Sequence, residues 1–226
     1  MTQPISHIRE GSSEPAVQIA PSPINGVDRL AKDTLDFAFA LIMIIFCAPL
    51  LLAVAILIRL DSPGPVMFTQ FRYGEGGRTF RIFKFRTLYV ADQDLSGAQQ
   101  VAKQDPRVTR IGHFLRASCI DELPQLFNVL LGDLSLVGPR PHPIGMRTEG
   151  RLGVAISPRY MERYRVKPGM TGLAQVRGHR GPLKRAEELE ARVASDLEYI
   201  ENWTLLGDVK ILLKTPICIL TQSGHL

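Results

Sequence analysis

Cysteine is scarce in this chain, and the common short motifs for metal and nucleotide binding do not occur. The three cysteines among 226 residues form no CxxC pair, which argues against a disulfide framework or a structural zinc site and favours a reducing compartment. The sequence contains no HExxH, Walker A or GxGxxG pattern, so it gives no support for zinc or dinucleotide chemistry. Few aromatic residues are interleaved with the basic ones, which argues against nucleic-acid binding by base stacking.

The first residues also lack the pattern of a signal peptide. Residues 1–28 contain Gly, Ser and four prolines but neither a basic start nor an apolar centre, and we expect a disordered tail there. The remaining length suits one globular domain plus a membrane element. Lys and Arg number 27 against 22 Asp and Glu, and this positive excess predicts an anionic partner such as a phosphate or an acidic lipid.

The longest apolar run covers residues 37–58 and contains no charged side chain. As a straight helix it would extend for about 33 Å, which is enough to cross a bilayer. Pro49 lies near its centre and predicts a sharp bend, because proline removes a backbone hydrogen bond and clashes with the preceding turn. Basic residues on both sides of the run favour two cytoplasmic ends. The residues alone leave open whether the helix crosses the membrane or dips in and returns.

Two strand-like segments follow the apolar run. A Pro-Gly-Pro turn precedes residues 66–70, and residues 79–88 mix apolar with basic side chains. In the second segment, Lys84 and Arg86 are residue types that bind phosphate, Lys as a mobile point charge and Arg through two parallel hydrogen bonds. The alternatives are an anion-binding strand and an edge strand whose charges are only solvated.

Residues 105–143 carry most of the chemical information. We expect a helix to begin near Asp121, with Ser118 or Cys119 as its cap and an apolar stripe on one side. Asp121 and Glu122 would then lie at the positive end of the helix dipole, where a carboxylate stays ionised and nucleophilic. Acidic residues are also ordinary in a first helical turn that has no catalytic role.

An arginine in a rigid loop follows this helix. Pro139 and Pro141 flank Arg140 and restrict the backbone, so the guanidinium can be preorganised for phosphate binding or for stabilising charge during transfer. Arg116 lies five residues before Asp121 and adds a further positive charge. The simpler interpretation is a rigid loop with a solvated arginine.

The C-terminal part is basic and rich in turns before it becomes helical. Residues 159–185 contain several arginines, with Pro and Gly at turn positions. Residues 184–203 predict an amphipathic helix, and residues 204–221 predict a mostly apolar helix interrupted by Pro216. The charged residues of this last helix make it too polar to span a bilayer, so we expect it at the membrane interface.

Three motifs occur together, namely FKFRT at residues 83–87, DELPQLFNVLLGDLSLVGPRP at 121–141 and KPGMTGLAQV at 167–176. Through these motifs and their order, the chain resembles the bacterial sugar transferases, which are monotopic polyprenyl-phosphate phosphoglycosyl transferases. The resemblance extends from about Lys32 onward. Larger members of that family have a multi-spanning N-terminal region, so this chain is similar to the minimal form.

The resemblance implies an α/β fold, mainly α with a short β element. Residues 29–60 would form a re-entrant membrane helix broken at Pro49. Residues 61–226 would form a small cytosolic catalytic domain with interfacial amphipathic helices, at the cytoplasmic face of the bacterial inner membrane and in contact with its lipids. Two positions depart from the family pattern: Ala48 replaces a serine and Asp33 replaces an arginine.

The activity that the resemblance implies is transfer of a sugar 1-phosphate from a UDP-sugar to undecaprenyl phosphate, with release of UMP. This reaction starts exopolysaccharide or other glycan assembly. Asp121 would be the nucleophile that forms a covalent phosphosugar, and Glu122 with Asp121 would hold Mg²⁺. The substrate phosphates would be bound by basic residues, for which we select Lys84, Arg86, Arg116, Arg140 and Arg165.

Two other functions fit some of these residues. A membrane-bound phosphatase or pyrophosphatase could also use Mg²⁺, an aspartate nucleophile and arginines, and a noncatalytic membrane interaction protein could retain only the fold. No short motif identifies the sugar. Phe127 and the C-terminal helix could support either membrane contact or a homodimer.

Overall fold

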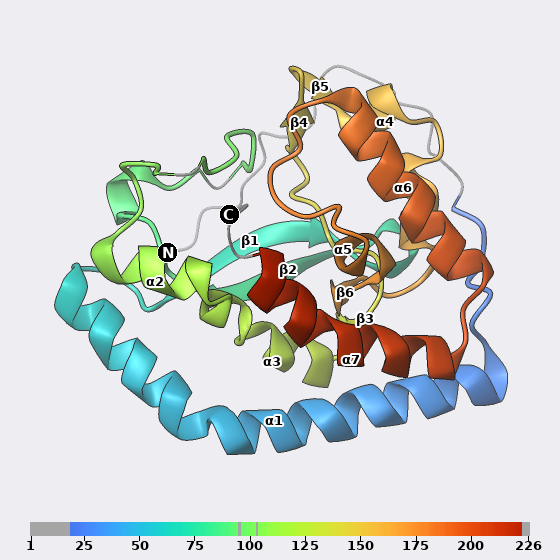
Figure 1. The fold of residues 1–226 in the computed structure, drawn as a ribbon, viewed down its shortest axis with the longest axis horizontal. Helices are drawn as coiled ribbons and strands as arrows, with labels where there is room; N and C mark the ends of the chain where they lie inside the picture. Colours follow the sequence, from blue (N-terminus) through green and yellow to red (C-terminus); the bar gives the residue numbers. More distant parts are fainter. Residues whose placement is uncertain (1–18, 95, 103, 223–226) are drawn as a thin grey trace, which may run out of the picture.

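The computed structural model describes residues 19–94, 96–102 and 104–222 and is a mixed α/β protein that is mostly helical, as expected (Figure 1). Its α-helices are α1 (Gly26–Asp61), α2 (Arg110–Ala117), α3 (Gln125–Leu130), α4 (Gly153–Ile156), α5 (Leu173–Val176), α6 (Ala186–Glu201) and α7 (Leu205–Gln222). Its strands are β1 (Met67–Tyr73), β2 (Thr79–Phe85), β3 (Ser135–Val137), β4 (Arg147–Thr148), β5 (Arg151–Leu152) and β6 (Gly169–Thr171). Short 3₁₀ turns are η1 (Glu75–Gly77), η2 (Val90–Asp92), η3 (Ile120–Glu122) and η4 (Tyr160–Arg165).

The long helix α1 runs along one side of the molecule (Figure 1). Among the described residues it is the one helix that is long and apolar enough to cross a membrane. Pro49 lies inside α1, and the helix continues through it, changing direction along its length (Figure 1). Only 17% of its most apolar window is buried in the protein. Most of the apolar side chains of α1 therefore face outward.

The segment just before α1 packs against the domain. The helix begins at Gly26, ahead of the expected boundary at residue 29, and Ile24 is 4% exposed and belongs to the core. Residues 1–18 of the expected disordered tail lie outside the described residues. The described end of that tail is thus part of the packed structure.

Buried charges anchor the first part of α1 to the domain. The Lys32 ammonium, 5% exposed, donates hydrogen bonds to Asp208 on α7 at 2.6 Å and to the carbonyl of Val137 at 3.1 Å. One turn later, Asp36 accepts a hydrogen bond from the Ser135 hydroxyl at 2.6 Å. These contacts tie α1 to α7 and to β3.

Arg86, which follows β2, anchors the other end of α1. Its guanidinium donates hydrogen bonds to the carbonyls of Ser62 and Pro63, both at 2.6 Å, and to the carbonyl of Ile58 in the last helical turn. Arg86 is 1% exposed, and it satisfies carbonyl groups that a helix C-terminus leaves unpaired. Both ends of α1 are consequently fixed to the same globular domain.

β1 and β2 form an antiparallel hairpin, which confirms the two strands expected near residues 66–70 and 79–88. The connection contains Gly76 and Gly77, which both have positive φ, a conformation that glycine adopts without steric cost. The hairpin supplies the edge against which α3 packs.

Asn128 on α3 joins that helix to β2. The Phe83 amide donates a hydrogen bond to the Asn128 side chain at 2.9 Å, and Asn128 donates one to the Arg81 carbonyl at 2.7 Å. Two backbone groups of β2 are thereby paired without a further strand. The contact brings Lys84 on β2 close to the turn that precedes α3.

A parallel strand pair joins two of the sequence motifs. β3 pairs with β6, with Ser135 opposite Gly169. The approach requires glycine, because a Cβ on Gly169 would lie 2.1 Å from the Gly138 nitrogen. The loop after β3 is therefore packed directly against the KPGMTG segment.

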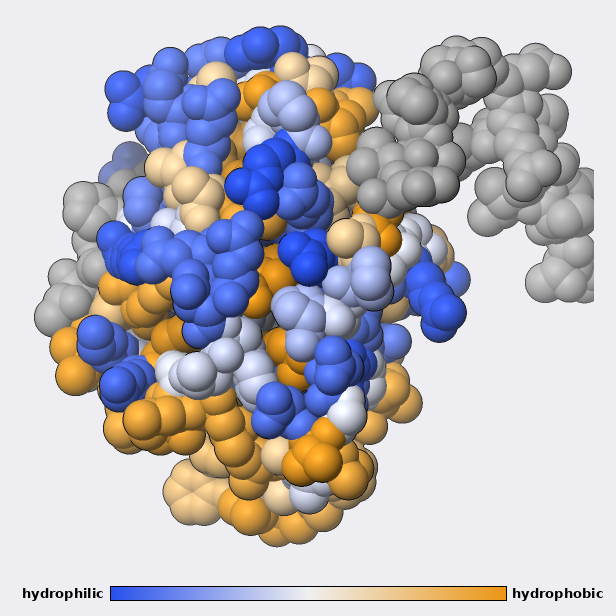
Figure 2. Space-filling model, turned by 90° about the vertical axis from the view of Figure 1, so that its right-hand side faces the viewer, coloured by the Kyte–Doolittle hydropathy of each residue, from blue (hydrophilic) through white to orange (hydrophobic). Residues whose placement is uncertain are grey.

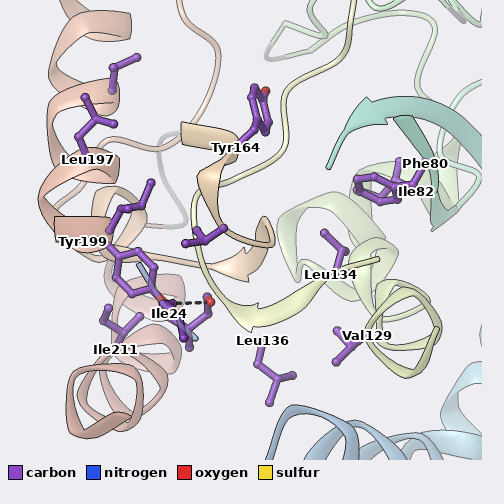
Figure 3. Packing of buried hydrophobic residues seen from close by; sticks show 14 of the residues in the cluster. Ile24, Phe80, Ile82, Val129, Leu134, Leu136, Tyr164, Leu197, Tyr199 and Ile211 are labelled. Atoms are coloured by element: carbon purple, nitrogen blue, oxygen red, sulfur yellow. Dashed lines mark hydrogen bonds between the residues drawn. The ribbon is translucent and has the colours of Figure 1, made fainter. Parts of the chain in front are cut away.

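The hydrophobic core lies between the hairpin, α3, α6 and α7 (Figure 3). Ile82 points into it from β2, Val129 from α3, Leu197 from α6 and Ile211 from α7. The helix α6 confirms the amphipathic helix predicted for this part of the chain. The expected interruption at Pro216 is wrong, because α7 continues through the proline.

One side of the molecule is apolar (Figure 2). Hydrophobic residues gather at the bottom of that view, the side along which α1 runs in Figure 1, and polar residues lie above them. Large exposed apolar side chains occur on α1, α3 and the segment after it, and α7, among them Phe46, Leu131 and Leu213. An exposed apolar surface of this kind marks contact with a membrane or another protein.

The buried ion pair of Lys32 and Asp208 leads to a stability prediction. Asp208→Ala removes the nearer carboxylate partner of the buried Lys32 ammonium and the acceptor of the Tyr199 hydroxyl, and it should lower the free energy of unfolding by about 3–5 kcal/mol. Asp208→Asn should lose less, because its side-chain oxygen can still accept hydrogen bonds from these groups. Denaturant unfolding in detergent micelles, followed by circular dichroism, measures both.

The exposed Glu201→Ala serves as the control for this prediction and should change the free energy of unfolding by less than about 0.5 kcal/mol. An Asp208→Asn variant no more stable than Asp208→Ala would contradict the assignment of the loss to buried donors left without an acceptor.

Candidate active site

The two candidate catalytic acids lie on a short turn between two helices. The Ser118 hydroxyl donates a hydrogen bond to the carbonyl of Phe114 at 2.8 Å and so closes α2. Cys119 has a φ of 57°, and η3 follows with Asp121 and Glu122. The expected cap by Ser118 or Cys119 is therefore wrong, because Ser118 ends the preceding helix and Cys119 makes no side-chain capping bond. The acids lie in a 3₁₀ turn and not in the first turn of an α-helix.

Glu122 is held between two cations. Lys84 donates a hydrogen bond to Glu122 Oε1 at 2.6 Å, and Arg140 donates to both carboxylate oxygens, with Nη1 3.0 Å from Oε2. Burial raises the pKa of Glu122, but Arg140 and Lys84 outweigh that effect and hold the pKa well below its ordinary value. Glu122 is consequently ionised throughout the physiological range.

Asp121 differs from its neighbour in its surroundings. It is 7% exposed, and burial raises its pKa to about 6, with Lys84 lowering the pKa and the charge of Glu122 raising it. Among the described residues Glu122 takes part in two ion pairs and Asp121 in none. Near neutral pH, Asp121 is thus a buried, mostly ionised carboxylate that is not already engaged by a cation.

Three separate elements supply the positive charges around the two acids. Lys84 comes from β2, Arg140 from the loop after β3, and Arg116 from the last turn of α2. Arg116 and Arg140 both lower the pKa of Asp121 through their charges. The structure thereby brings together Asp121, Glu122 and three of the five predicted phosphate-binding residues.

The other two predicted phosphate-binding residues lie elsewhere. The guanidinium of Arg86 is enclosed at the C-terminal end of α1, where it pairs with backbone carbonyls. Arg165, at the end of η4, donates a hydrogen bond to the carbonyl of Pro21. Arg86 was selected as a phosphate-binding residue because it is a basic residue in a motif. In the structure its guanidinium instead binds backbone carbonyls at the end of α1.

Sequence reasoning missed two arginines, Arg72 and Arg163, whose side chains donate hydrogen bonds to backbone carbonyls of the Arg140 loop. Arg72 on β1 donates a hydrogen bond to the Pro141 carbonyl at 3.1 Å, and burial, followed by the charge of Arg140, lowers its pKa to about 10. Arg163 is fully buried and pairs with Asp196 at 2.7 Å. The period-two pattern of β1 places Gln70 and Arg72 on one face, a signal that could have identified Arg72.

The adjacent carboxylates are the groups that can hold a metal at this site. Mg²⁺ is usually bound through one or two carboxylates together with oxygens of substrate phosphates. Among the described residues, no cluster of three His, Cys, Asp or Glu side chains could hold a metal, and Glu122 is already engaged by two cations. The donor set fits a metal that arrives with a diphosphate, and not a site built from protein ligands alone.

The sequence was compared with protein-family models and with known proteins. The sequence model described as "Bacterial sugar transferase" matches residues 27–222. The "Exopolysaccharide production protein PSS" of Rhizobium leguminosarum bv. phaseoli is 47% identical over 197 residues, which cover 87% of this chain and 98% of that protein. This match covers most of this chain and nearly all of the relative.

Longer relatives match over only part of their length. The UDP-glucose:undecaprenyl-phosphate glucose-1-phosphate transferase of Escherichia coli (strain K12) is 41% identical over 93% of this chain and 44% of its own length. The UDP-N-acetylgalactosamine-undecaprenyl-phosphate N-acetylgalactosaminephosphotransferase of Aeromonas hydrophila is 43% identical over 97% of this chain and 49% of its own length. This chain thus spans less than half of these two relatives.

The family match over most of the sequence and the identities to named transferases confirm the resemblance drawn from the three motifs. The chain belongs to the bacterial sugar transferase family.

Proposed function

We propose that this protein transfers a sugar 1-phosphate from a UDP-sugar to undecaprenyl phosphate, through a covalent intermediate on Asp121. The observation that carries the proposal is the buried pair of acids, in which Glu122 is fixed by Lys84 and Arg140 while Asp121 takes part in no ion pair among the described residues. The names of the relatives support the acceptor and the type of donor.

The reaction has two displacement steps at one phosphorus. The Asp121 carboxylate attacks the sugar-bearing phosphorus of the UDP-sugar, the bond from that phosphorus to the bridging oxygen breaks, and UMP leaves with the bond electrons. The product is a mixed anhydride between Asp121 and the sugar phosphate. A phosphate oxygen of undecaprenyl phosphate then attacks the same phosphorus, which frees the carboxylate and forms the lipid diphosphosugar.

Positive charge near the acids favours this chemistry. The charges of Lys84, Arg116 and Arg140 lower the pKa of Asp121. Arg72 lies close enough to Arg140 and Glu122 for their charges to shift its pKa. Four cations thus act on the two carboxylates, two of them through ion pairs with Glu122, and this excess of positive charge suits a donor that carries a diphosphate. Attack of one anion on another requires such neutralisation.

Mg²⁺ fits the same site. Asp121 and Glu122 would hold it together with phosphate oxygens of the donor, and the ion would supply charge neutralisation for the leaving UMP. Within the protein, Glu122 keeps Lys84 and Arg140 in place, and those side chains orient the donor phosphates beside Asp121.

A re-entrant course of α1 is the membrane arrangement that we favour. The helix is long enough to span a bilayer, yet Lys32 near its start and Arg86 at its end fix it to one globular domain. Two ends held on the same domain support a course in which both lie on the same side of the membrane. The exposed apolar side chains of α1, α3 and α7 would then enter the cytoplasmic leaflet of the bacterial inner membrane and bring Asp121 near the lipid acceptor.

The glycan made from the product is exopolysaccharide in this proposal, by analogy with the Rhizobium relative. The transferred sugar stays open, since relatives are named for both glucose and N-acetylgalactosamine. A phosphatase or pyrophosphatase would act on a phosphate donor without the lipid acceptor, and a noncatalytic protein would not release UMP at all.

The first prediction of the proposed function concerns the nucleophile. Purified protein with Mg²⁺ and undecaprenyl phosphate should release UMP from at least one member of a UDP-sugar panel, and Asp121→Asn should lower kcat by about 10³-fold or more. The exposed Asp92→Asn, which changes charge outside the site, is the matched control. UMP release independent of the lipid, or unaffected by Asp121→Asn, would contradict the proposal.

The second prediction concerns Lys84. Lys84→Met removes one of the two cations on Glu122 and should lower kcat by about 10²–10³-fold, because a preorganised charge is lost where negative charge develops. The exposed Lys184→Met should retain wild-type activity. Steady-state UMP release with the best donor measures both, and equal activities would remove Lys84 from the active site.

The third prediction concerns the course of α1. Single cysteines in place of Asn25, just before α1, and Arg78, in the exposed hairpin turn, should both be modified by a membrane-impermeant maleimide in inverted inner-membrane vesicles and protected in intact spheroplasts. Both cysteines are introduced into a background in which Cys47, Cys119 and Cys218 are replaced by serine or alanine. Labelling of the two positions from opposite sides would mean that α1 spans the membrane.

A further inference from the structure

The loop that carries Arg140 has an unusual backbone. Pro139 and Pro141 have no amide hydrogen, so this part of the loop can accept hydrogen bonds through its carbonyls but donates few. The direction in which the Arg140 side chain leaves the backbone is set by the orientation of the adjoining peptide planes. Hydrogen bonds to the carbonyls of Pro139, Arg140 and Pro141 therefore determine the direction of the Arg140 guanidinium.

Each of the three carbonyls accepts a hydrogen bond from a different element. The Gly169 amide on β6 donates to the Pro139 carbonyl at 2.9 Å. Arg163 Nη2 on η4 donates to the Arg140 carbonyl at 2.8 Å, and Arg72 Nη1 on β1 donates to the Pro141 carbonyl at 3.1 Å. Two of the three donors are thus arginine side chains.

Arg163 is itself held on every side. It is 0% exposed, its Nε donates to Asp196 at 2.7 Å, and its Nη1 donates to His142 Nδ1 at 3.1 Å. Its guanidinium also lies over the rings of Tyr160 and Tyr164, 5.3 and 5.6 Å from their centroids. These contacts hold Arg163 Nη2 within hydrogen-bonding distance of the Arg140 carbonyl.

Arg72 is also held by a neighbouring side chain. Its Nη2 donates to the Gln70 side chain at 2.6 Å, on the same face of β1. The charge of Arg72 also repels that of Arg140, as the lowered pKa of Arg72 reflects after burial. Repulsion between the two guanidinium groups thus adds to the hydrogen bonds by which Arg140 is directed toward Glu122.

We propose that Arg72 and Arg163 are positioning residues, which hold the backbone of Pro139, Arg140 and Pro141 so that the Arg140 guanidinium is aimed at Glu122 and the reacting phosphates. The proposal rests on the transferase function proposed above. Among the described residues neither arginine donates a hydrogen bond to Glu122 or Asp121, and both bind the backbone that carries Arg140. Arginine is required because its planar fork serves two or three acceptors at once, which one lysine ammonium cannot reach.

Kinetics with UDP-glucose and UDP-N-acetylgalactosamine as donors provide the test. Arg72→Lys and Arg163→Lys keep the charge but lose the fork, and each should lower kcat by about 10- to 100-fold, since small displacements of a positioned group have effects of that size. KM for the donor should stay within about threefold, because the binding groups themselves remain. The controls are the exposed Arg78→Lys on the hairpin and Arg159→Lys beside η4, which should retain wild-type kcat.

A double-variant cycle distinguishes positioning from a general structural role. In an Arg140→Lys background, a further Arg72→Lys should change kcat by less than about twofold, because both changes remove the same interaction. Losses that multiply would show that Arg72 acts elsewhere and would overturn the proposal. Arg72→Lys carries the test alone if Arg163→Lys fails to fold, since Arg163 is fully buried and Arg72 is only partly so.

Amide hydrogen exchange gives a measurement that does not depend on activity. Peptides covering residues 137–146 should exchange faster in Arg72→Lys than in the wild type, and unchanged exchange would overturn the positioning role. Wild-type protein that releases no UMP from any donor would instead refute the proposed function, whereas an active wild type with unaffected Arg72→Lys kinetics would refute only the present inference.

Discussion

Glu122 is a carboxylate held between Lys84 and Arg140, and this one interaction connects three distant parts of the chain. Lys84 comes from the hairpin, Glu122 from the turn after α2, and Arg140 from the loop after β3. Burial alone would make an ionised glutamate costly here, and the two cations reverse that effect. The geometry around Asp121 depends on this triad, because Lys84 and Arg140 are also the charges that lower the pKa of Asp121 against its burial.

The arrangement of α1 follows a similar logic on a larger scale. Most side chains in the apolar part of this long helix are not buried on the domain. Polar contacts fix its two ends, where Lys32 and Asp36 reach β3 and α7 and Arg86 binds the last turn, and Val54 and Ile58 add apolar packing. β3 leads directly into the Arg140 loop, so the contacts that anchor α1 also support the backbone that carries Arg140.

Local patterns in the sequence predicted several elements correctly. Strand-like segments after a Pro-Gly-Pro turn indicated β1 and β2, amphipathic spacing indicated α6, and the uncharged run indicated α1. Caps and interruptions were less predictable. Ser118 has the right chemistry for the start of a helix but closes the helix before it, and Pro216 lies within α7. The preference of Ser118 for a helix start is outweighed by its hydrogen bond within the preceding helix, and the tendency of Pro216 to interrupt a helix is outweighed by the context of α7.

The sequence by itself determined the family, and it also carried the acidic pair Asp121–Glu122 and the basic residues predicted to bind phosphate, because these are short motifs in which the chemistry is carried by neighbouring residues. Only the tertiary structure decided which cations meet those acids. It brought Lys84, Arg116 and Arg140 together, placed Arg86 at the end of α1, and set Arg72 and Arg163 behind the Arg140 loop. The physical reason is that an arginine has the same chemistry in any motif, whereas its partner is fixed by strand pairing and helix packing between residues far apart in the chain.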